Sequence, residues 1–439
     1  MMSKQNIVRI LLILFIVIIS SSILIGNPRL VPGEETTSSS FDARSEEAPP
    51  TDNITVVTGQ GIIAYDSNGS ILYENGTYEY YWDVDPEPEQ RTVLYAATER
   101  VDEQTQCVPI EFGEHCIRHV IERLNLETGE TERIFSHVTP KKRSSEWHDV
   151  DRINENHLLI AGMYSDRVFI VDTSTGLINW QWNVQNNYSL DTGGQYPENW
   201  VHLNDVEYIH NGTVMVSLRN QDQVVFVDTD RGLIQNMTLG EENEYSILYE
   251  QHNPDYIPTS KGGPAVLISD SENNRVVEYQ RTDGEWTQTW TWKDQVLTWP
   301  RDADRLPNGN TLITDSHGDR VLEVNEQGEI VWEIKVSYPY EAERLETSPE
   351  STGGQSAIAA DLESRGQNTA TQVSRSTSSI TDLLPNKIAN GIRSIVPWWM
   401  TIRTVAMLII LVVTSTFWIT LEFYWSTYKL RSPIRRGQS

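Results

Sequence analysis

The sequence has little positive charge. Its 439 residues include 34 Lys and Arg against 62 Asp and Glu, which gives a formal net charge of -28. We expect no nucleic acid partner, because phosphates would be repelled and no basic patch is present to bind them. An acidic surface of this kind resembles that of proteins from highly saline cells, where carboxylates keep the surface hydrated.

Several catalytic motifs are also missing from the sequence. There is no nucleophile elbow with a Ser-His-Asp arrangement, no glycine loop that would cradle a phosphate and no H-E-x-x-H. These absences argue against serine hydrolases, nucleotide-binding enzymes and zincin metalloproteases. We therefore expect no cofactor and no resident metal.

Cysteine is scarce, with only Cys107 and Cys116 in the chain. In an exported protein, two cysteines with eight residues between them predict a disulfide that closes a loop between strands. Metal binding together with His115 is the alternative, although these three residues form an incomplete ligand set. Six N-x-S/T sequons fit a glycosylated exported surface; they begin at Asn53, Asn68, Asn75, Asn187, Asn211 and Asn236.

Long apolar runs occur only near the two ends of the chain. Residues 10–26 carry no charge and follow Lys4 and Arg9, and residues 404–421 form a second uncharged run with tryptophans on both sides. Each run predicts a transmembrane helix, and a cleaved signal peptide is the alternative for the first. Basic residues at both chain ends predict that both ends are cytoplasmic, so the middle of the protein lies outside the cell, attached to the bilayer.

The composition between these runs divides the chain further. Segments rich in Ser, Thr, Pro, Gly and Glu read as linkers that cannot bury a core. The predicted organisation is a cytoplasmic N-terminus (1–9), a transmembrane helix or signal peptide (10–27), a linker (28–53), a globular domain (54–346), a polar stalk (347–396), a transmembrane helix (397–425) and a basic cytoplasmic tail (426–439).

The globular domain is built from a repeat of about 45–50 residues. Each copy holds an acidic segment, a turn with Asn or Gly and further alternating apolar runs, which predicts four short strands and no helix. The clearest copies are residues 299–334 and 146–182. The domain is therefore predicted to be an all-β, six-bladed β-propeller, flanked by the N- and C-terminal transmembrane helices. One blade is split, with later strands in residues 54–74 and an opening strand in residues 339–345.

Aligning the opening strands places polar residues in one column. The motifs "HDVD", "NDVE", "HNPD" and "RDAD" begin at His148, Asn204, His252 and Arg301. Because the opening strand of a blade lines the central channel, these four side chains should meet at one mouth of the propeller. His202 is expected on the same face by strand alternation, and Arg219 at the level of the following loop.

Other recurring residues are interpreted as structural. The acidic pair of each opening strand is expected to cap turns and to pair with the arginine that follows it. The tryptophans of the fourth strands are expected to pack between blades; they are Trp180, Trp182, Trp290, Trp292 and Trp332. A histidine in a propeller is more often structural than functional, so the site prediction depends on three histidines sharing one register with arginines.

Four short motifs resemble those of a known family. "WHD" at 147–149, "HLNDV" at 202–206, "SLRNQDQVVFVD" at 217–228 and "QHN" at 251–253 are similar to motifs of the arylsulfotransferases, whose bacterial members are exported six-bladed propellers. The resemblance implies transfer of a sulfuryl group from an aryl sulfate ester to a phenolic or other hydroxyl acceptor, without a nucleotide sulfate donor. It further implies His252 as the nucleophile that becomes sulfated, and His148, His202, Asn204 and Arg219 as ligands of the sulfuryl oxygens. Arg301, from the aligned column, is expected to bind the same anionic group.

Two other functions are compatible with the same fold. A non-catalytic propeller that binds glycans or proteins at the cell surface would use its outer loops, since this architecture hosts many functions. A metal-dependent hydrolase would use the three histidines as zinc ligands, although neighbouring arginine and asparagine side chains favour an anion over a cation. The sequence leaves the donor, the acceptor and the oligomeric state open.

Overall fold

The computed structural model describes residues 9, 12, 13, 15, 16, 20, 54–88, 91–101, 107, 116–345, 347, 353–366, 387, 388, 390, 391 and 402–425. They belong to two units. One comprises residues 41–374 and the other residues 1–40 together with 375–439. The predicted linker (28–53) and tail (426–439) lie outside the described residues, and so do almost all residues of the predicted N-terminus and first span (1–27).

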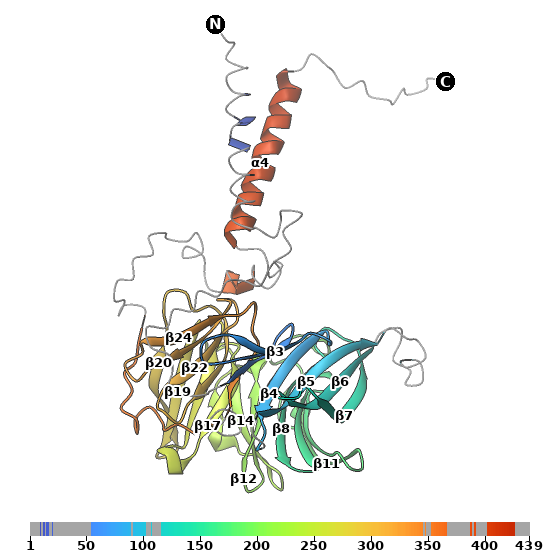
Figure 1. Ribbon diagram of the computed structural model, residues 1–439, viewed down its shortest axis with the longest axis vertical. Helices are drawn as coiled ribbons and strands as arrows, with labels where there is room; N and C mark the ends of the chain where they lie inside the picture. The colour runs from blue at the N-terminus through green and yellow to red at the C-terminus, as the bar shows by residue number, and fades with distance from the viewer. Residues whose placement is uncertain are drawn as a thin grey trace. The chain divides into compact units, whose positions relative to one another are not determined.

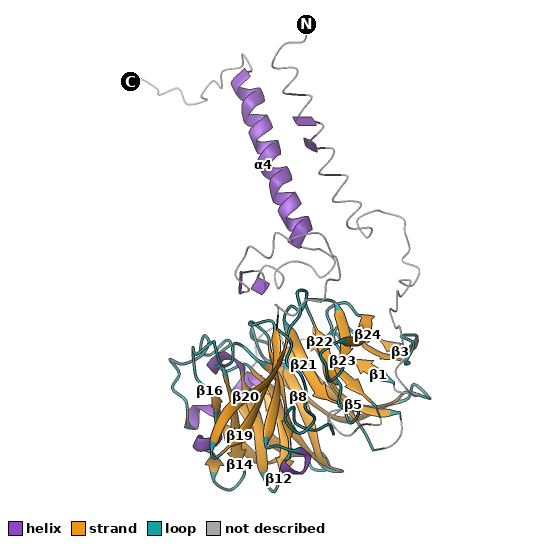
Figure 2. Ribbon diagram, turned by 90° about the vertical axis from the view of Figure 1, so that its left-hand side faces the viewer, coloured by secondary structure: helices purple, strands orange, loops and turns teal. Residues whose placement is uncertain are grey.

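The larger unit consists of six antiparallel sheets that stand side by side (Figures 1 and 2). The first three blades contain β25 (Ala342–Arg344), β1 (Thr55–Val57), β2 (Ile62–Tyr65) and β3 (Ile71–Asn75); β4 (Tyr80–Pro86), β5 (Thr92–Val101), β6 (Cys116–Asn125) and β7 (Thr131–Pro140); and β8 (Trp147–Asn154), β9 (His157–Gly162), β10 (Arg167–Asp172) and β11 (Leu177–Asn183).

The remaining three blades follow in chain order. They contain β12 (Leu203–His210), β13 (Thr213–Leu218), β14 (Gln223–Asp228), β15 (Gly232–Leu233) and β16 (Leu239–Gly240); β17 (His252–Ile257), β18 (Ala265–Asp270), β19 (Arg275–Thr282) and β20 (Glu285–Trp292); and β21 (Pro300–Arg305), β22 (Thr311–Asp315), β23 (Arg320–Val324) and β24 (Ile330–Lys335). The predicted all-β, six-bladed propeller is confirmed.

The strands follow from local sequence. Middle strands such as β22 and β23 are buried on both faces and read as apolar runs, as expected for a sheet covered by its neighbours. Glycine occupies the turns that need a left-handed backbone, at Gly309 (φ 91°) between β21 and β22 and at Gly328 (φ 73°) between β23 and β24.

The ring closes through the predicted split blade. The innermost strands adjoin one another in the order β25, β4, β8, β12, β17 and β21. Strand β25, from the end of the domain, pairs antiparallel with β1 from its beginning, with Ala342 opposite Val57. The two ends of the propeller are therefore held in one sheet.

Apolar side chains fill the spaces between blades, as predicted for the tryptophans. Trp290 and Trp292 are buried between the fifth and sixth blades, and Trp332 is buried between the sixth and the first. Large aromatic side chains of this kind typically contribute about 3–5 kcal/mol each when compared with alanine. The inter-blade core is thus the main source of the ring's stability.

The acidic pairs have a different role from the one expected. The innermost strand of each blade has a free edge along the channel, and its N–H groups need acceptors. A carboxylate from the preceding blade supplies one: Asp149 Oδ2 accepts from Val206 N at 2.6 Å, and Asp302 Oδ2 accepts from Ala342 N at 3.1 Å. Glu341 Oε2 accepts from Val84 N at 3.1 Å in the same way.

The arginine that follows the acidic pair has another partner. Arg305 Nη2 lies 3.2 Å from Glu278 Oε2, and Arg344 Nη2 lies 2.7 Å from Glu323 Oε2. Both glutamates are on the third strand of the neighbouring blade, so the predicted pairing of this arginine with its own acidic pair is wrong. The carboxylates cap the edge of the next blade, and the arginine links back to the previous one.

Part of the predicted stalk packs on the propeller. Residues 353–366 lie against the fifth and sixth blades, where Ala357 N donates to both carboxylate oxygens of Glu278 at 2.8 and 3.0 Å and Arg365 N donates to Thr291 O at 2.9 Å. Ser356 is fully buried there. The prediction of a polar stalk over 347–396 is therefore corrected for this segment, because its backbone hydrogen bonds and the buried Ala357 hold it against the propeller.

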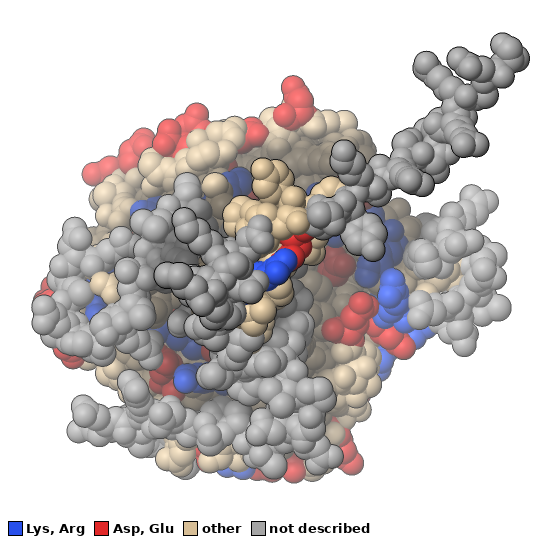
Figure 3. Space-filling model, turned by 90° about the horizontal axis from the view of Figure 1, so that it is seen from above, with Lys and Arg blue, Asp and Glu red and all other residues tan. Residues whose placement is uncertain are grey.

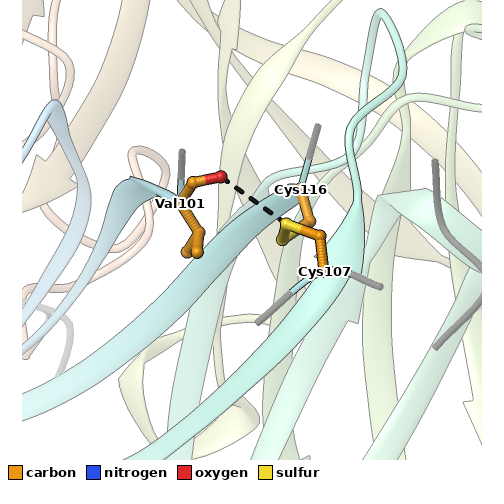
Figure 4. The surroundings of a disulfide bond; sticks show 3 residues. All are labelled: Val101, Cys107 and Cys116. Carbon is orange, nitrogen blue, oxygen red and sulfur yellow. Dashed lines mark hydrogen bonds between the residues drawn. A yellow bond between two sulfur atoms is a disulfide. The ribbon is translucent and has the colours of Figure 1, made fainter. Parts of the chain in front are cut away.

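The predicted disulfide joins Cys107 and Cys116, whose Cα atoms are 5.8 Å apart (Figure 4). Cys116 begins β6, and Cys107 Sγ lies 3.5 Å from the carbonyl oxygen of Val101 at the end of β5. The bridge thus anchors the loop between these strands. Acidic side chains are prominent on the visible rim of the propeller, with basic ones between them (Figure 3).

The other unit contains the helix α4 (Ile402–Trp425). Its segment Met407–Trp425 is exposed and has a mean hydropathy of 1.8, so by length and composition it can cross a membrane. Near the end of α4, Glu422 receives two hydrogen bonds from Arg9, at 2.5 and 2.6 Å. The apolar surface of α4 therefore carries one paired acid.

Candidate functional site

Each blade contributes one side chain to a common column at the start of its innermost strand. Local β-bulges release several of these residues from regular pairing, which lets the backbone redirect the side chain. The column consists of Trp82, His148, Asn204, His252, Arg301 and Tyr340. The four members predicted from the alignment are joined by two aromatic residues.

Two positions before the column, the backbone is left-handed in four blades. The φ values are 56° at His202, 46° at Glu250, 54° at Trp299 and 50° at Tyr338. Non-glycine residues rarely adopt this conformation, and such strain concentrates at functional sites. His202 therefore reaches the site through a left-handed turn, and the expected strand alternation is not the reason.

The hydrogen bonds of His252 define its tautomer. Ser271 Oγ lies 2.7 Å from the carbonyl oxygen of Pro300, which can only accept, so the hydroxyl proton is donated there. The same Ser271 oxygen lies 2.8 Å from His252 Nδ1 and must accept the proton of that nitrogen. No described residue hydrogen-bonds to His252 Nε2, so its lone pair is available.

The lone pair of His202, unlike that of His252, has a hydrogen-bond partner. Arg219 Nη1 lies 3.0 Å from His202 Nε2, and because a guanidinium only donates, Nε2 is the acceptor. The proton is then on Nδ1, which lies 2.7 Å from Asn199 Oδ1. Arg219 also forms an ion pair with Glu250, at 3.3 Å. The lone pair of His202 is thus occupied, which leaves it unsuited to act as a nucleophile.

His148 adjoins His202, with ring centroids 5.1 Å apart. Its Nδ1 lies 2.8 Å from the hydroxyl of Tyr340, and its ring stacks on Trp82 at 4.3 Å. If the Tyr340 hydroxyl donates to Nδ1, the proton of the imidazole is on Nε2, where it can be donated to a ligand.

Arg301 is enclosed by aromatic rings. Its guanidinium carbon lies 4.9 Å from the ring centroid of Tyr338 and 4.7 Å from that of Tyr340, and Nη2 donates to the Tyr338 hydroxyl at 3.2 Å. Within the described part of the chain, Nε and Nη1 have no hydrogen-bond acceptor. Buried donors of this kind normally have partners, so Arg301 is prepared to bind an anion.

Asn204 is more deeply placed than the other column residues. Its Nδ2 donates to the backbone carbonyl of Gln251 at 2.8 Å, directly before His252, and the residue has no solvent exposure. Gln251 in turn donates to Gln223 O at 2.8 Å. Asn204 therefore holds the backbone that carries His252, and its Oδ1 has no donor among the described residues.

The site keeps its histidines neutral. Burial, followed by the charges of Arg301 and Arg219, lowers the pKa values of His148 and His252 well below the usual value. The pKa of His202 is lowered well below its usual value for the same reasons, with burial first and Arg219 second. Burial raises the pKa of Tyr340, so its hydroxyl keeps its proton. Neutral imidazoles beside fixed cations can attack or polarise an oxyanion.

Four residues of this region are absent from the sequence prediction. Tyr340 had a signal in the sequence, because "PYEAERL" mirrors "PRDADRL" and aligns it with Arg301. Trp82 had a similar signal in "WDVD". Ser271 follows the second strand of its blade at the position that Arg219 occupies in the preceding blade. His317 stacks on Trp299, with ring centroids 5.1 Å apart. No motif in the sequence marks His317 as part of this region.

Comparison with known families supports the resemblance. The arylsulfotransferase (ASST) family model matches this chain. The match spans residues 178–337 and confirms the predicted family over that range. It contains His202, Asn204, Arg219, His252 and Arg301, whereas the first three blades, with His148, lie mostly before it.

Comparisons of the chain with curated proteins and with solved structures are less specific. No curated protein matches the chain. A protein of unknown function from Bacteroides caccae is 10% identical, with a TM-score of 0.48 and coverage of 67% of this chain and 100% of its own. The periplasmic gluconolactonase of Pseudomonas aeruginosa is 11% identical, with a TM-score of 0.44 and coverage of 68% and 100%. At these TM-scores the similarities carry no functional conclusion.

Proposed function

We propose that this protein is a sulfotransferase that moves a sulfuryl group from an aryl sulfate ester to a phenolic or other hydroxyl acceptor through a sulfated His252. The single observation that carries the proposal is the orientation of the His252 imidazole. Its Nδ1 proton is held by Ser271, and its Nε2 lone pair has no partner among the described residues and faces the charges of Arg301 and Arg219. The arylsulfotransferase match over residues 178–337 supports the same reaction class.

The proposed reaction has two balanced steps. In the first, His252 Nε2 forms a bond to sulfur while the ester S–O bond breaks, and the phenol oxygen leaves as an anion. In the second, the acceptor oxygen forms a bond to sulfur and the S–N bond breaks, while the acceptor's hydroxyl proton leaves to solvent, where it protonates the phenolate released in the first step. The enzyme returns to neutral His252 with its proton on Nδ1.

The surrounding side chains supply positive charge and donors where charge develops. Arg301, with unused N–H groups, and Arg219 are suited to the sulfuryl oxygens, and the Nε2 proton of His148 is suited to an oxygen of the same group. His202 fixes the guanidinium of Arg219 at 3.0 Å. Asn204 acts through the backbone that precedes His252, so we assign it a positioning role and not direct contact with the substrate.

The proposal includes a membrane location. The helix α4 is apolar enough to anchor the protein, and the disulfide between Cys107 and Cys116 fits an oxidising compartment. We therefore propose a propeller attached to the cell membrane and facing outside, where donor and acceptor are small molecules or surface groups.

The test uses the purified full-length protein and an aryl sulfate whose phenol is coloured. Wild type should release a burst of phenol and gain one sulfuryl group on His252, detected by peptide mass spectrometry at neutral or alkaline pH. His252→Ala should abolish both. The matched control is His210→Ala, on an exposed position of β12, which should keep both. A labelled residue other than His252, or a burst that persists in His252→Ala, would refute the assignment.

The second candidate function is binding without catalysis. It is favoured if the purified protein neither releases phenol nor becomes sulfated while it retains glycans or proteins through its outer loops. In that case His252→Ala and Arg219→Ala would leave partner binding unchanged, because both side chains are largely buried.

A further inference from the structure

Carboxylates follow the column residues along the channel. Asp302 and Asp304 belong to β21, and Glu343 belongs to β25, the strand that closes the ring. One carboxylate oxygen from each of the three lies within 4.8 Å of the others, and all three residues are buried. Strands from the two ends of the propeller thus direct acidic groups to one point.

The charge of Asp304 is poorly compensated by the described residues. Asp304 is 3% exposed, and its Oδ2 receives no hydrogen bond from any described residue. Arg344, the cation that acts on Asp304, lies 2.7 Å from Glu323 and is paired with that residue. Burial of carboxylates without a cation carries a large free-energy cost, and for this reason it raises the pKa of Asp304 well above the usual value.

Another carboxylate adjoins this trio. Asp255 from the fifth blade acts electrostatically on both Asp302 and Asp304, and within the described residues its Oδ2 also lacks a hydrogen-bond donor. One oxygen of Asp302 accepts from Ala342 N and Thr314 Oγ1, at 3.1 and 3.3 Å. The cluster therefore offers several buried oxygen atoms and no nitrogen or sulfur ligand.

The geometry suits a hard divalent cation. Calcium binds about 6–8 oxygen atoms at about 2.3–2.6 Å, so two oxygens on one ion can be at most about 5 Å apart. The separation of the three carboxylates falls within this limit. We propose that Asp302, Asp304 and Glu343 form a calcium-binding site that joins β21 to β25 and stabilises the closed ring. Asp302 directly follows Arg301 on β21, and Asp304 lies two residues further along the strand. The inference does not depend on the proposed reaction.

The experiment measures calcium binding by the full-length protein in detergent after removal of divalent ions with a chelator. Isothermal titration with CaCl2 is performed in high salt, which screens weak binding to the acidic surface. Wild type should bind one calcium ion per chain at this site, and calcium should raise its thermal midpoint. Asp304→Asn and Glu343→Gln should each weaken binding at least tenfold.

The matched control is Asp151→Asn, on the third blade. Asp151 is also a channel carboxylate that accepts from a neighbouring strand, at 2.6 Å from Tyr208 N, but it does not belong to the trio of Asp302, Asp304 and Glu343. The Asp151→Asn variant should bind calcium as tightly as wild type does. If wild type shows neither binding nor a thermal shift at millimolar calcium, protons neutralise the cluster and the site is refuted. Equal loss in Asp151→Asn would also overturn it, since binding would then depend on channel charge alone.

Discussion

Replacing Ser271 by alanine tests the proposed tautomer of His252. The serine hydroxyl accepts a hydrogen bond from Nδ1–H at 2.8 Å and donates one to Pro300 O at 2.7 Å. In Ser271→Ala, the nearest remaining acceptor for Nδ1 is the Glu250 carbonyl at 3.2 Å, which is a longer bond. The tautomer with its proton on Nε2 then competes, and that tautomer cannot attack sulfur.

The size of the effect follows from these bonds. A neutral hydrogen bond contributes about 1 kcal/mol, and each 1.36 kcal/mol is about tenfold in rate, so one lost bond corresponds to a roughly fivefold slower sulfation of His252. Loss of orientation as well would give about thirtyfold for 2 kcal/mol. Ser271 is fully buried and does not reach the substrate, so the rate of the burst should fall while KM stays nearly constant.

The assay is the pre-steady-state burst of phenol, with two comparison variants. Ser316→Ala changes the equivalent loop position of the sixth blade, which is also fully buried but whose hydroxyl has no partner among the described residues. It should leave the burst rate unchanged, and Ser271→Thr should restore much of the rate. Equal burst rates in Ser271→Ala and Ser316→Ala would refute the tautomer argument.

Three other properties can be tested. Tyr340→Phe removes the hydroxyl that is hydrogen-bonded to His148 and should slow phenol release about fivefold, for a loss of about 1 kcal/mol. Tyr245→Phe changes an exposed tyrosine with a 2.8 Å hydrogen bond and should leave the rate unchanged. Equal rates in the two variants would contradict the donor role of Tyr340. Burial raises the pKa of Asp149 to about 7. The folded protein therefore holds this proton more tightly than the unfolded chain, and the resulting contribution to folding stability is present below about pH 4 and is lost as the pH rises through about 7. In chelator, the thermal midpoint should fall from pH 5 to 8, less so in Asp149→Asn, and a midpoint fall of the same size in both proteins would exclude this carboxyl. Cysteines introduced by Arg9→Cys and Glu422→Cys should react together with a short thiol crosslinker in membranes, since the native side chains are 2.5 Å apart, and failure to crosslink while each cysteine is accessible would refute the pair.

The fold could be predicted from the sequence because its determinants are local. Alternating apolar runs, turns with glycine and a repeated acidic opening define each blade before any contact is known. The same repeat placed His148, His252 and Arg301 in one column, and the structure brings them to one mouth. The roles of these residues in catalysis are still predictions, which the variants above test.

Features that depend on contacts between distant segments could not be predicted. The tautomer of His252 depends on the Pro300 carbonyl in the next blade, which no pattern within the blade of His252 reveals. The segment 353–366 looks like a linker because the stretch around it is rich in Ser, Thr and Gly, yet the Glu278 carboxylate fixes its backbone and Ala357 joins the core between the fifth and sixth blades. The acidic pairs were misread because their acceptor role requires the free edge of the next blade.

The split blade has a consequence for biosynthesis. Tyr340, which contacts His148, belongs to the segment that docks beside β1 only after the rest of the domain has emerged. A nascent chain that has completed five blades would still lack Tyr340 and the closing strand β25. A polypeptide truncated before Tyr340 would therefore lack both the strand that closes the ring and the hydroxyl group that contacts His148.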